Sequence, residues 1–128
     1  GIERSILGRM VFSDKEKLKT LNRIVHPYLK QRVVHCIKTE KKPMVVEGAL
    51  LDQLDLTNEC HVIVVVDMPD ELLMRPENNK QHILQFQPSR QTYLNMADYV
   101  VENRLTDTFF EKSRLISQKI LSCARISR

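Results

Sequence analysis

A run of five apolar, β-branched residues constrains this chain more than any other feature. Residues 62–66 read Val-Ile-Val-Val-Val, and Asp67 closes the run. Two heavy atoms on each Cβ restrict χ1, so the run disfavours a helix. Because no polar residue alternates with the apolar ones, it predicts a central parallel strand that helices cover on both faces. The same pattern also fits a plain buried strand followed by a solvated turn.

The carboxyl end of this predicted strand is the first place where functional side chains are expected. In open parallel sheets, ligands bind beyond the carboxyl ends of the strands. Asp67 is followed at once by a proline turn and a second acidic residue, so residues 67–75 form the candidate segment.

Composition places the chain among soluble, single-domain proteins. Its 128 residues are 42% hydrophobic and 28% charged, which is ordinary for a globular protein with a real core. No apolar run reaches the roughly 20 residues that a membrane span needs. The net charge of +4 fits an anionic partner, and a basic nucleic-acid-binding domain is one alternative. However, tryptophan is absent and aromatic residues make up 5%, so stacking platforms for nucleic acid are sparse.

The cysteines and histidines predict neither a disulfide framework nor a metal site. Cys36, Cys60 and Cys123 are odd in number and far apart, and no C-x-x-C pair occurs. Free thiols in a reducing cytoplasm are therefore expected. The four histidines fall on separate predicted elements, which does not match the spacing of metal ligands.

The first 42 residues predict three helices. The first covers residues 3–11, and a capping box formed by Ser13 and Glu16 begins the second. The second helix is expected to stop near His26, because the residue before a proline avoids the α region. Pro27 would then occupy the first position of the third helix.

The rest of the chain predicts an alternation of strands and helices. Strands are expected over residues 44–47, 62–67 and 97–103, with a short helix or turn over 50–56. Helices are expected over residues 71–74, 83–86 and 89–96, and from 108 onward. This order favours an α/β layer structure with right-handed parallel crossovers. Three strands make a narrow sheet, so a first strand and its helix are expected to be missing before Gly1.

Few residues outside the strand ends point to chemistry. The sequence contains neither a G-x-x-x-x-G-K-[ST] nor a G-x-G-x-x-G pattern, and its three glycines cannot build a phosphate cradle. His26 stands at the predicted helix–helix corner, where it serves either packing and capping or a functional role. Arg75, Arg90 and Arg104 lie around the predicted strand ends, where each could bind phosphate or remain in solvent.

Four short motifs are spread over nearly the whole chain. They are Arg4-x-x-Leu7 with Val11-Phe12, Leu21-x-x-Ile24-Val25-His26-Pro27, Leu50-Leu51 after a predicted strand, and Gln87 with Ala97-Asp98 and Val101-x-Asn103. Each is short, but in this order and at these separations they resemble the motifs of the dephospho-coenzyme A kinase family.

The resemblance implies an α/β fold, a P-loop kinase-like parallel sheet flanked by helices. Within one domain, residues 1–42 would form a helical acceptor-binding part and 43–75 the core strands. Residues 76–96 would form a lid, and 97–128 the C-terminal strand and helix. The implied reaction transfers the γ-phosphoryl group of ATP, with Mg²⁺, to the ribose 3′-hydroxyl of dephospho-coenzyme A. This is the final step of coenzyme A synthesis.

The resemblance also assigns binding residues by position. Arg4 and His26 would lie near the acceptor, Arg75 in the lid facing the ATP phosphates, and Asn103 near the adenine. Positioning and charge stabilisation dominate phosphoryl transfer, so arginines and a closing lid suit it. No catalytic residue and no metal ligand is carried over, because the family's phosphate loop and Asp-x-Asp motif would lie before Gly1.

Three departures qualify this interpretation. Ala49 stands where the family has proline, and Asp52-Gln53 where it has Phe-Glu. The lid is shorter than usual, so Arg75 matches either of two family arginines. Without a phosphate loop the 128-residue chain is expected to be inactive alone. The alternative is a non-catalytic remnant or interaction module that retains only the acceptor-binding half.

Overall fold

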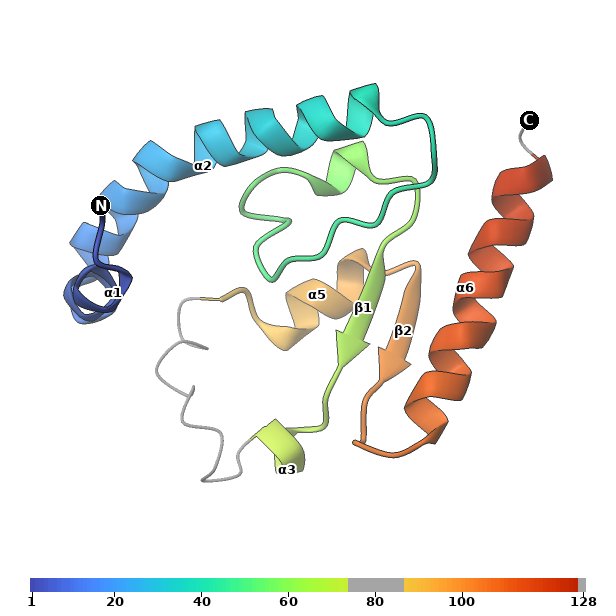
Figure 1. Cartoon of the computed structure of the whole chain (residues 1–128). Coiled ribbons are helices and arrows are strands. Elements are labelled where there is room, and N and C mark those ends of the chain that lie inside the picture. Colours follow the sequence, from blue (N-terminus) through green and yellow to red (C-terminus); the bar gives the residue numbers. More distant parts are fainter. Residues whose placement is uncertain (74–86, 127–128) are drawn as a thin grey trace. The chain divides into compact units, whose positions relative to one another are not determined.

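The computed structural model describes residues 1–73 and 87–126, which divide into two compact units. Unit 1 contains residues 1–60 together with Gln87, and unit 2 contains residues 61–73 and 88–126. Figure 1 shows the helices and strands of both units. The expected division into acceptor, core, lid and C-terminal parts of one domain remains a prediction.

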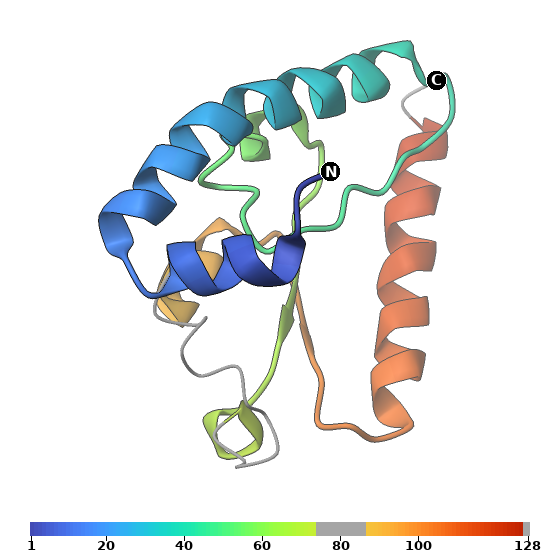
Figure 2. The ribbon, with the colours of Figure 1, turned by 60° about the vertical axis from the view of Figure 1, so that its left-hand side comes forward.

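Unit 1 begins with two helices that pack against each other. These are α1 (Arg4–Phe12) and α2 (Lys15–Thr39), and they meet at an angle across a short turn (Figure 2). The predicted Ser13–Glu16 capping box is wrong, because Asp14 caps α2 instead. Its carboxylate accepts hydrogen bonds from the backbone N–H groups of Glu16 (3.0 Å) and Lys17 (3.2 Å). An aspartate at this position also suits the positive end of the helix dipole.

The helix α2 runs without a break through Pro27. The predicted end at His26 is therefore wrong, and no helix–helix corner exists there. Proline removes one backbone hydrogen bond inside a helix, which usually kinks or breaks it. In this chain hydrogen-bonded turns continue on both sides of the exposed Pro27, so the helix survives the loss.

The loop after α2 forms no strand within the part of unit 1 that the structure describes. The strand predicted over residues 44–47 is therefore wrong, and Val45 is 93% exposed. A strand needs a neighbour with which to share its backbone hydrogen bonds, and the one sheet among the described residues pairs two other segments.

The turn expected over residues 50–56 is present and supplies the core of unit 1. Leu54 N–H donates to the Leu50 carbonyl at 2.9 Å, and Leu56 N–H donates to the Leu51 carbonyl at 2.8 Å. Leu54 and Leu56 are buried, as is Val11 on α1. A short 3-10 helix, η1 (Thr57–Glu59), ends the unit.

Unit 2 is built on a pair of parallel strands. Strands β1 (Val64–Asp67) and β2 (Tyr99–Glu102) run side by side from the Val64↔Tyr99 pair to the Asp67↔Glu102 pair (Figure 1). Both strands lie within the predicted ranges. Their pairing is parallel, as predicted.

The expectation that helices cover β1 on both faces is wrong for the described residues. Val64 and Val66 are 41% and 58% exposed, whereas Val101 on β2 is 3% exposed. The β-branched run therefore predicted the strand correctly, because propensity is local. It did not predict coverage, because the burial of a strand depends on which elements pack against it.

Among the described residues of unit 2, three helices accompany the two strands. They are α3 (Asp70–Leu73), α5 (Arg90–Met96) and α6 (Thr108–Ile126). The helices α5 and α6 confirm two predicted helices; α5 contacts β1 and α6 contacts β2 (Figures 1 and 2). Ser89 caps α5 by accepting a hydrogen bond from Thr92 N–H at 3.2 Å. Helices together with a small parallel sheet are compatible with a P-loop kinase-like fold.

None of the helices among the described residues is long and apolar enough to cross a bilayer. The three cysteines form no disulfide bond in the part of the chain that the structure describes, which agrees with the expected thiols.

Candidate functional site

The side chains at the carboxyl end of β1 are held by a two-pronged ion pair. Arg90 Nε donates to Asp67 Oδ1 at 2.7 Å, and Arg90 Nη2 donates to Asp67 Oδ2 at 2.6 Å. The Asp67 side chain is 11% exposed and the Arg90 side chain 49%. These hydrogen bonds hold the pKa of Asp67 below its usual value and raise the pKa of Arg90. Paired geometry of this kind is the most specific contact that arginine makes with a carboxylate.

The position of Arg90 is not explained by the stability of its own helix. It is the first residue of α5, whose first turn contains no acidic residue. A positive charge at a helix N-terminus opposes the helix dipole. The contact with Asp67 therefore accounts for this arginine.

Asn103 follows β2 and lies beside the same strand end. Its backbone N–H donates to the Asp67 carbonyl at 2.7 Å, and its side-chain Oδ1 accepts from Leu105 N–H at 2.9 Å. Leu105 has a φ of 60°, in the left-handed region that a leucine rarely adopts. Because Leu105 presents a donor, the oxygen of the Asn103 carboxamide must face it, and the amino group faces elsewhere.

Arg104 also forms ion pairs with carboxylates. It donates to Glu71 Oε1 at 3.2 Å and to Glu102 Oε1 at 2.9 Å, and it lowers the pKa of Glu102. Of the three arginines that the sequence suggested as phosphate ligands, Arg90 and Arg104 are therefore both ion-paired within unit 2, and Arg75 lies outside the described residues.

The carboxylates at this strand end outnumber the guanidinium groups. Asp70 and Glu102 act on Arg90 in addition to Asp67, and Glu71 contacts Arg104. Among the described residues, four carboxylates thus face two guanidinium groups and the ammonium group of Lys112, which acts on Glu102, so a bare anion gains little here while the ion pairs are intact.

His26 lies in unit 1, where it lines a shallow hollow of about 430 Å³. It is half-buried on α2, and the facing wall is the turn that contains Leu54 and Asp55. Lys30 forms an ion pair with Asp55 across this hollow and lowers the pKa of Asp55. Arg23 also lines it, so basic side chains surround a largely apolar surface.

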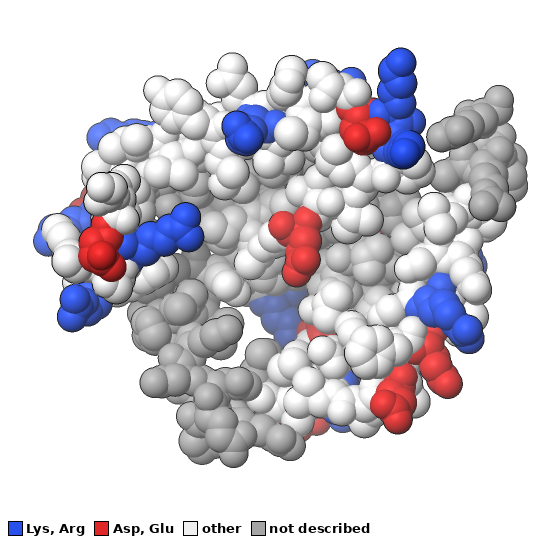
Figure 3. Space-filling model, viewed as in Figure 1, with Lys and Arg blue, Asp and Glu red and all other residues white. Residues whose placement is uncertain are grey.

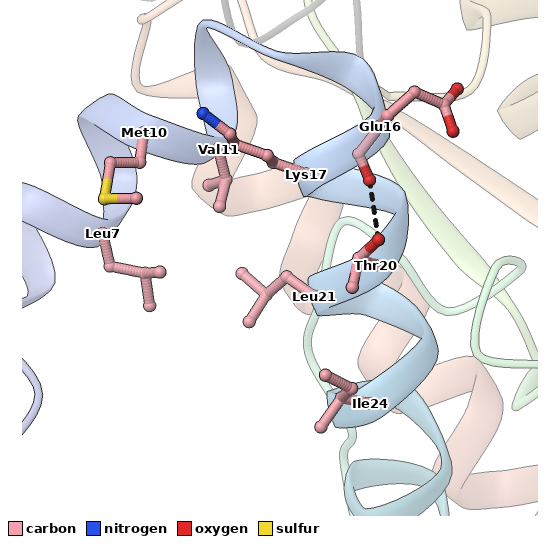
Figure 4. A pocket seen from close by; sticks show the side chains of 8 residues that line it. All are labelled: Leu7, Met10, Val11, Glu16, Lys17, Thr20, Leu21 and Ile24. Atoms are coloured by element: carbon pink, nitrogen blue, oxygen red, sulfur yellow. Dashed lines mark hydrogen bonds between the residues drawn. The ribbon is translucent and has the colours of Figure 1, made fainter.

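A second hollow of about 410 Å³ lies between α1 and α2. Figure 4 shows Leu7 from α1 and Leu21 and Ile24 from α2 pointing into the same space, with Lys17 near its edge. Arg4 is exposed at the start of α1 and lines neither hollow.

The predicted site residues are thus distributed over different places. His26 and Arg4 lie on separate helices of unit 1, and Asn103 lies at the strand end of unit 2. Arg75 lies outside the described residues. The sequence did not predict the contact between Asp67 and Arg90, although each residue lay near a predicted strand end.

One motif residue proves to be structural. Ile63 N–H donates to Asp98 Oδ2 at 2.7 Å, and Asp98 N–H donates to the Ile63 carbonyl at 2.9 Å. The aspartate of the Ala97-Asp98 motif therefore sets the start of the parallel ladder.

The described residues do not fit a metal centre. Across residues 1–73 and 87–126, no group of three or more His, Cys, Asp or Glu side chains is arranged to hold a metal ion. On the face seen in Figure 3, several Lys and Arg side chains of the described residues lie next to Asp or Glu side chains.

Comparison with known families decides the assignment. A model of the family described as dephospho-CoA kinase matches residues 1–107. The chain belongs to the dephospho-CoA kinase family. The four motifs that suggested this family all lie inside the matched range.

Individual relatives agree with the family match. The dephospho-CoA kinase of Thermobifida fusca is 30% identical over 122 residues, which are 83% of this chain and 58% of the relative. That of Idiomarina loihiensis is 29% identical over 80% of this chain and 55% of the relative. That of Chlorobium chlorochromatii is 27% identical over 99% of this chain and 66% of the relative. The chain therefore spans somewhat more than half the length of these relatives.

Proposed function

We propose that the protein containing this chain phosphorylates the ribose 3′-hydroxyl of dephospho-coenzyme A with ATP, in the cytoplasm, as the last step of coenzyme A synthesis. The family match over residues 1–107 carries this proposal. Since the chain covers only part of its relatives, the activity is proposed for a full-length protein rather than for the 128 residues alone.

The acceptor is proposed to bind through unit 1. Dephospho-coenzyme A has an adenine, an anionic diphosphate and a long arm in which amide groups separate short apolar stretches. The hollow beside His26 offers Arg23 next to an apolar surface, which is proposed to meet the diphosphate and the arm, whereas Lys30 is paired with Asp55. Arg4 is proposed to contact the acceptor from α1, and this assignment rests on the family resemblance.

The nucleotide is proposed to bind at the carboxyl end of β1 and β2. Asn103 lies there with its carboxamide oxygen accepting from Leu105 N–H, and its amino group is proposed to contact the ligand. A purine ring offers nitrogen acceptors to such a donor. Arg75 is proposed to contact the ATP phosphates on the strength of the resemblance.

Mg²⁺ is implied by the family. No group of three or more His, Cys, Asp or Glu side chains among the described residues is arranged to hold a metal ion, and we propose that the protein contacts of Mg²⁺ come from outside these residues.

A coupled assay on the full-length protein tests this function. ATP consumption should depend on dephospho-coenzyme A, and coenzyme A should replace it poorly because its 3′-hydroxyl is already phosphorylated. If the rate of ATP consumption is the same with and without dephospho-coenzyme A, the non-catalytic module would be favoured instead.

A further inference from the structure

The Asp67–Arg90 pair joins three segments that are distant in sequence. The Asp67 carboxylate binds Arg90 at the start of α5, and the Asp67 carbonyl accepts from Asn103 N–H after β2. Asp67 itself ends β1. One residue thus fixes both the first turn of α5 and the turn that follows β2.

The turn after β2 needs such support because its geometry is strained. Leu105 is held in the left-handed region, where a branched side chain is disfavoured. Its N–H is bound by Asn103 Oδ1, and Asn103 is bound in turn through its own N–H by Asp67. The main chain of the Asn103 turn is therefore tied to the main chain of Asp67, the residue whose side chain Arg90 holds.

Arg90 is poorly placed to leave Asp67 for a phosphate. The carboxylate it binds is 11% exposed, and Glu102 is its partner in the strand register. Withdrawing Arg90 would give up two short hydrogen bonds and leave the Asp67 carboxylate unpaired beside Glu102, which is unfavourable because the two like charges repel.

We propose that Asp67 and Arg90 are a positioning pair that orients the Asn103 turn toward the nucleotide, and that Arg90 does not contact phosphate itself. The kinetic part of this proposal rests on the proposed function; its structural part does not.

A double-mutant cycle in the full-length protein tests the pair. Asp67→Ala, Arg90→Ala and the double variant should each lower kcat/KM for ATP by roughly 10- to 100-fold, as expected for misplaced binding groups. The double variant should be no worse than either single variant, because each change already removes the same interaction. KM for dephospho-coenzyme A should stay unchanged. Asp67→Asn, which keeps the side-chain shape, should show a smaller loss in the same direction.

A phosphate-binding Arg90 predicts a different pattern. Arg90→Ala would then be far more damaging than Asp67→Ala, and Asp67→Ala would tighten ATP binding by freeing the guanidinium group. That pattern, or additive losses in the double variant, would overturn the proposal.

Amide hydrogen exchange provides a readout that needs no activity. Both alanine variants should lower protection of the Asn103 and Leu105 amides by on the order of tenfold or more. Lys19→Ala, which removes an exposed ion pair with Glu16 on α2, serves as the matched control and should leave this protection unchanged. Unchanged protection in the Asp67 and Arg90 variants would overturn the positioning role. Loss of protection in a protein without kinase activity would instead retain the pair and reject the proposed function.

Discussion

At the residue scale, Asn103 combines two functions in one side chain. Its oxygen completes the turn by binding Leu105 N–H, and its amino group is proposed to contact the nucleotide. Alanine removes both groups, whereas aspartate keeps an oxygen acceptor and removes the donor.

These two substitutions should therefore separate stability from binding. Asn103→Ala should lower the melting temperature and raise KM for ATP. Asn103→Asp should raise KM for ATP as well, but it should leave the melting temperature close to the parent value. Thermal melts and ATP titrations of the full-length protein measure both effects. Equal melting losses in the two variants would contradict the role of the oxygen in the turn.

The Asp67–Arg90 pair also predicts a pH dependence of stability. Arg90 holds the pKa of Asp67 below its unfolded value of 3.8. A depressed carboxyl pKa contributes stability that is present above the unfolded pKa and is lost as the pH falls through the folded pKa. The free energy of unfolding of the parent, measured with urea, should therefore fall below about pH 4. In Asp67→Asn the free energy of unfolding should fall less steeply over that range. Parallel pH profiles for the two proteins would contradict the pairing.

At the element scale, the strand pair offers two valines in matched positions. Val66 and Val101 face each other in the parallel register, but their exposed fractions are 58% and 3%. Burial, rather than residue type or strand position, should decide the cost of truncating each one.

Val101→Ala should destabilise the protein by about 2 kcal/mol, from the lost methyl groups and the cavity they leave. Val66→Ala should change stability by less than about 0.5 kcal/mol, as is usual for exposed sites. Denaturant unfolding of both variants provides the comparison. Similar losses at the two positions would show that an additional surface covers Val66.

Sequence patterns predicted the elements whose formation is local. The β-branched run predicted β1, and the pattern of residues 89–96 predicted α5. The strand expected over residues 44–47 failed because strand formation also requires a partner, which no local pattern specifies. The break at Pro27 failed because the turns on both sides of the proline hold α2 together.

The candidate site was predictable only in part. Its place at the strand ends followed from the general behaviour of parallel sheets, and Asn103 followed from the family resemblance. The partner of Arg90 could not be inferred, because Asp67 is 23 residues away and their contact depends on how β1 and α5 pack. Arginine near a strand end suggested phosphate, whereas the structure gives it a carboxylate.

At the scale of the whole molecule, the described part of the chain buries few large apolar side chains. Val11, Leu54, Leu56 and Val101 are buried, whereas many others are exposed, among them Val66, Val100 and Phe110. The sequence also contains no glycine-rich phosphate loop. From both observations we propose that the 128 residues alone do not carry out the reaction.

The 128-residue chain alone should therefore form no coenzyme A from dephospho-coenzyme A and ATP with Mg²⁺. A chromatographic assay with the full-length protein as the positive control measures this. Turnover by the isolated chain would show that ATP binding does not require a glycine-rich loop.

The most direct test of the proposed function is to locate the new phosphate. The full-length protein should convert dephospho-coenzyme A and ATP into a product that carries one added phosphate on the ribose 3′-oxygen, as read by tandem mass spectrometry and ³¹P NMR. Its formation should require both substrates. An unmodified acceptor, or a phosphate attached at any other position, would contradict the assignment.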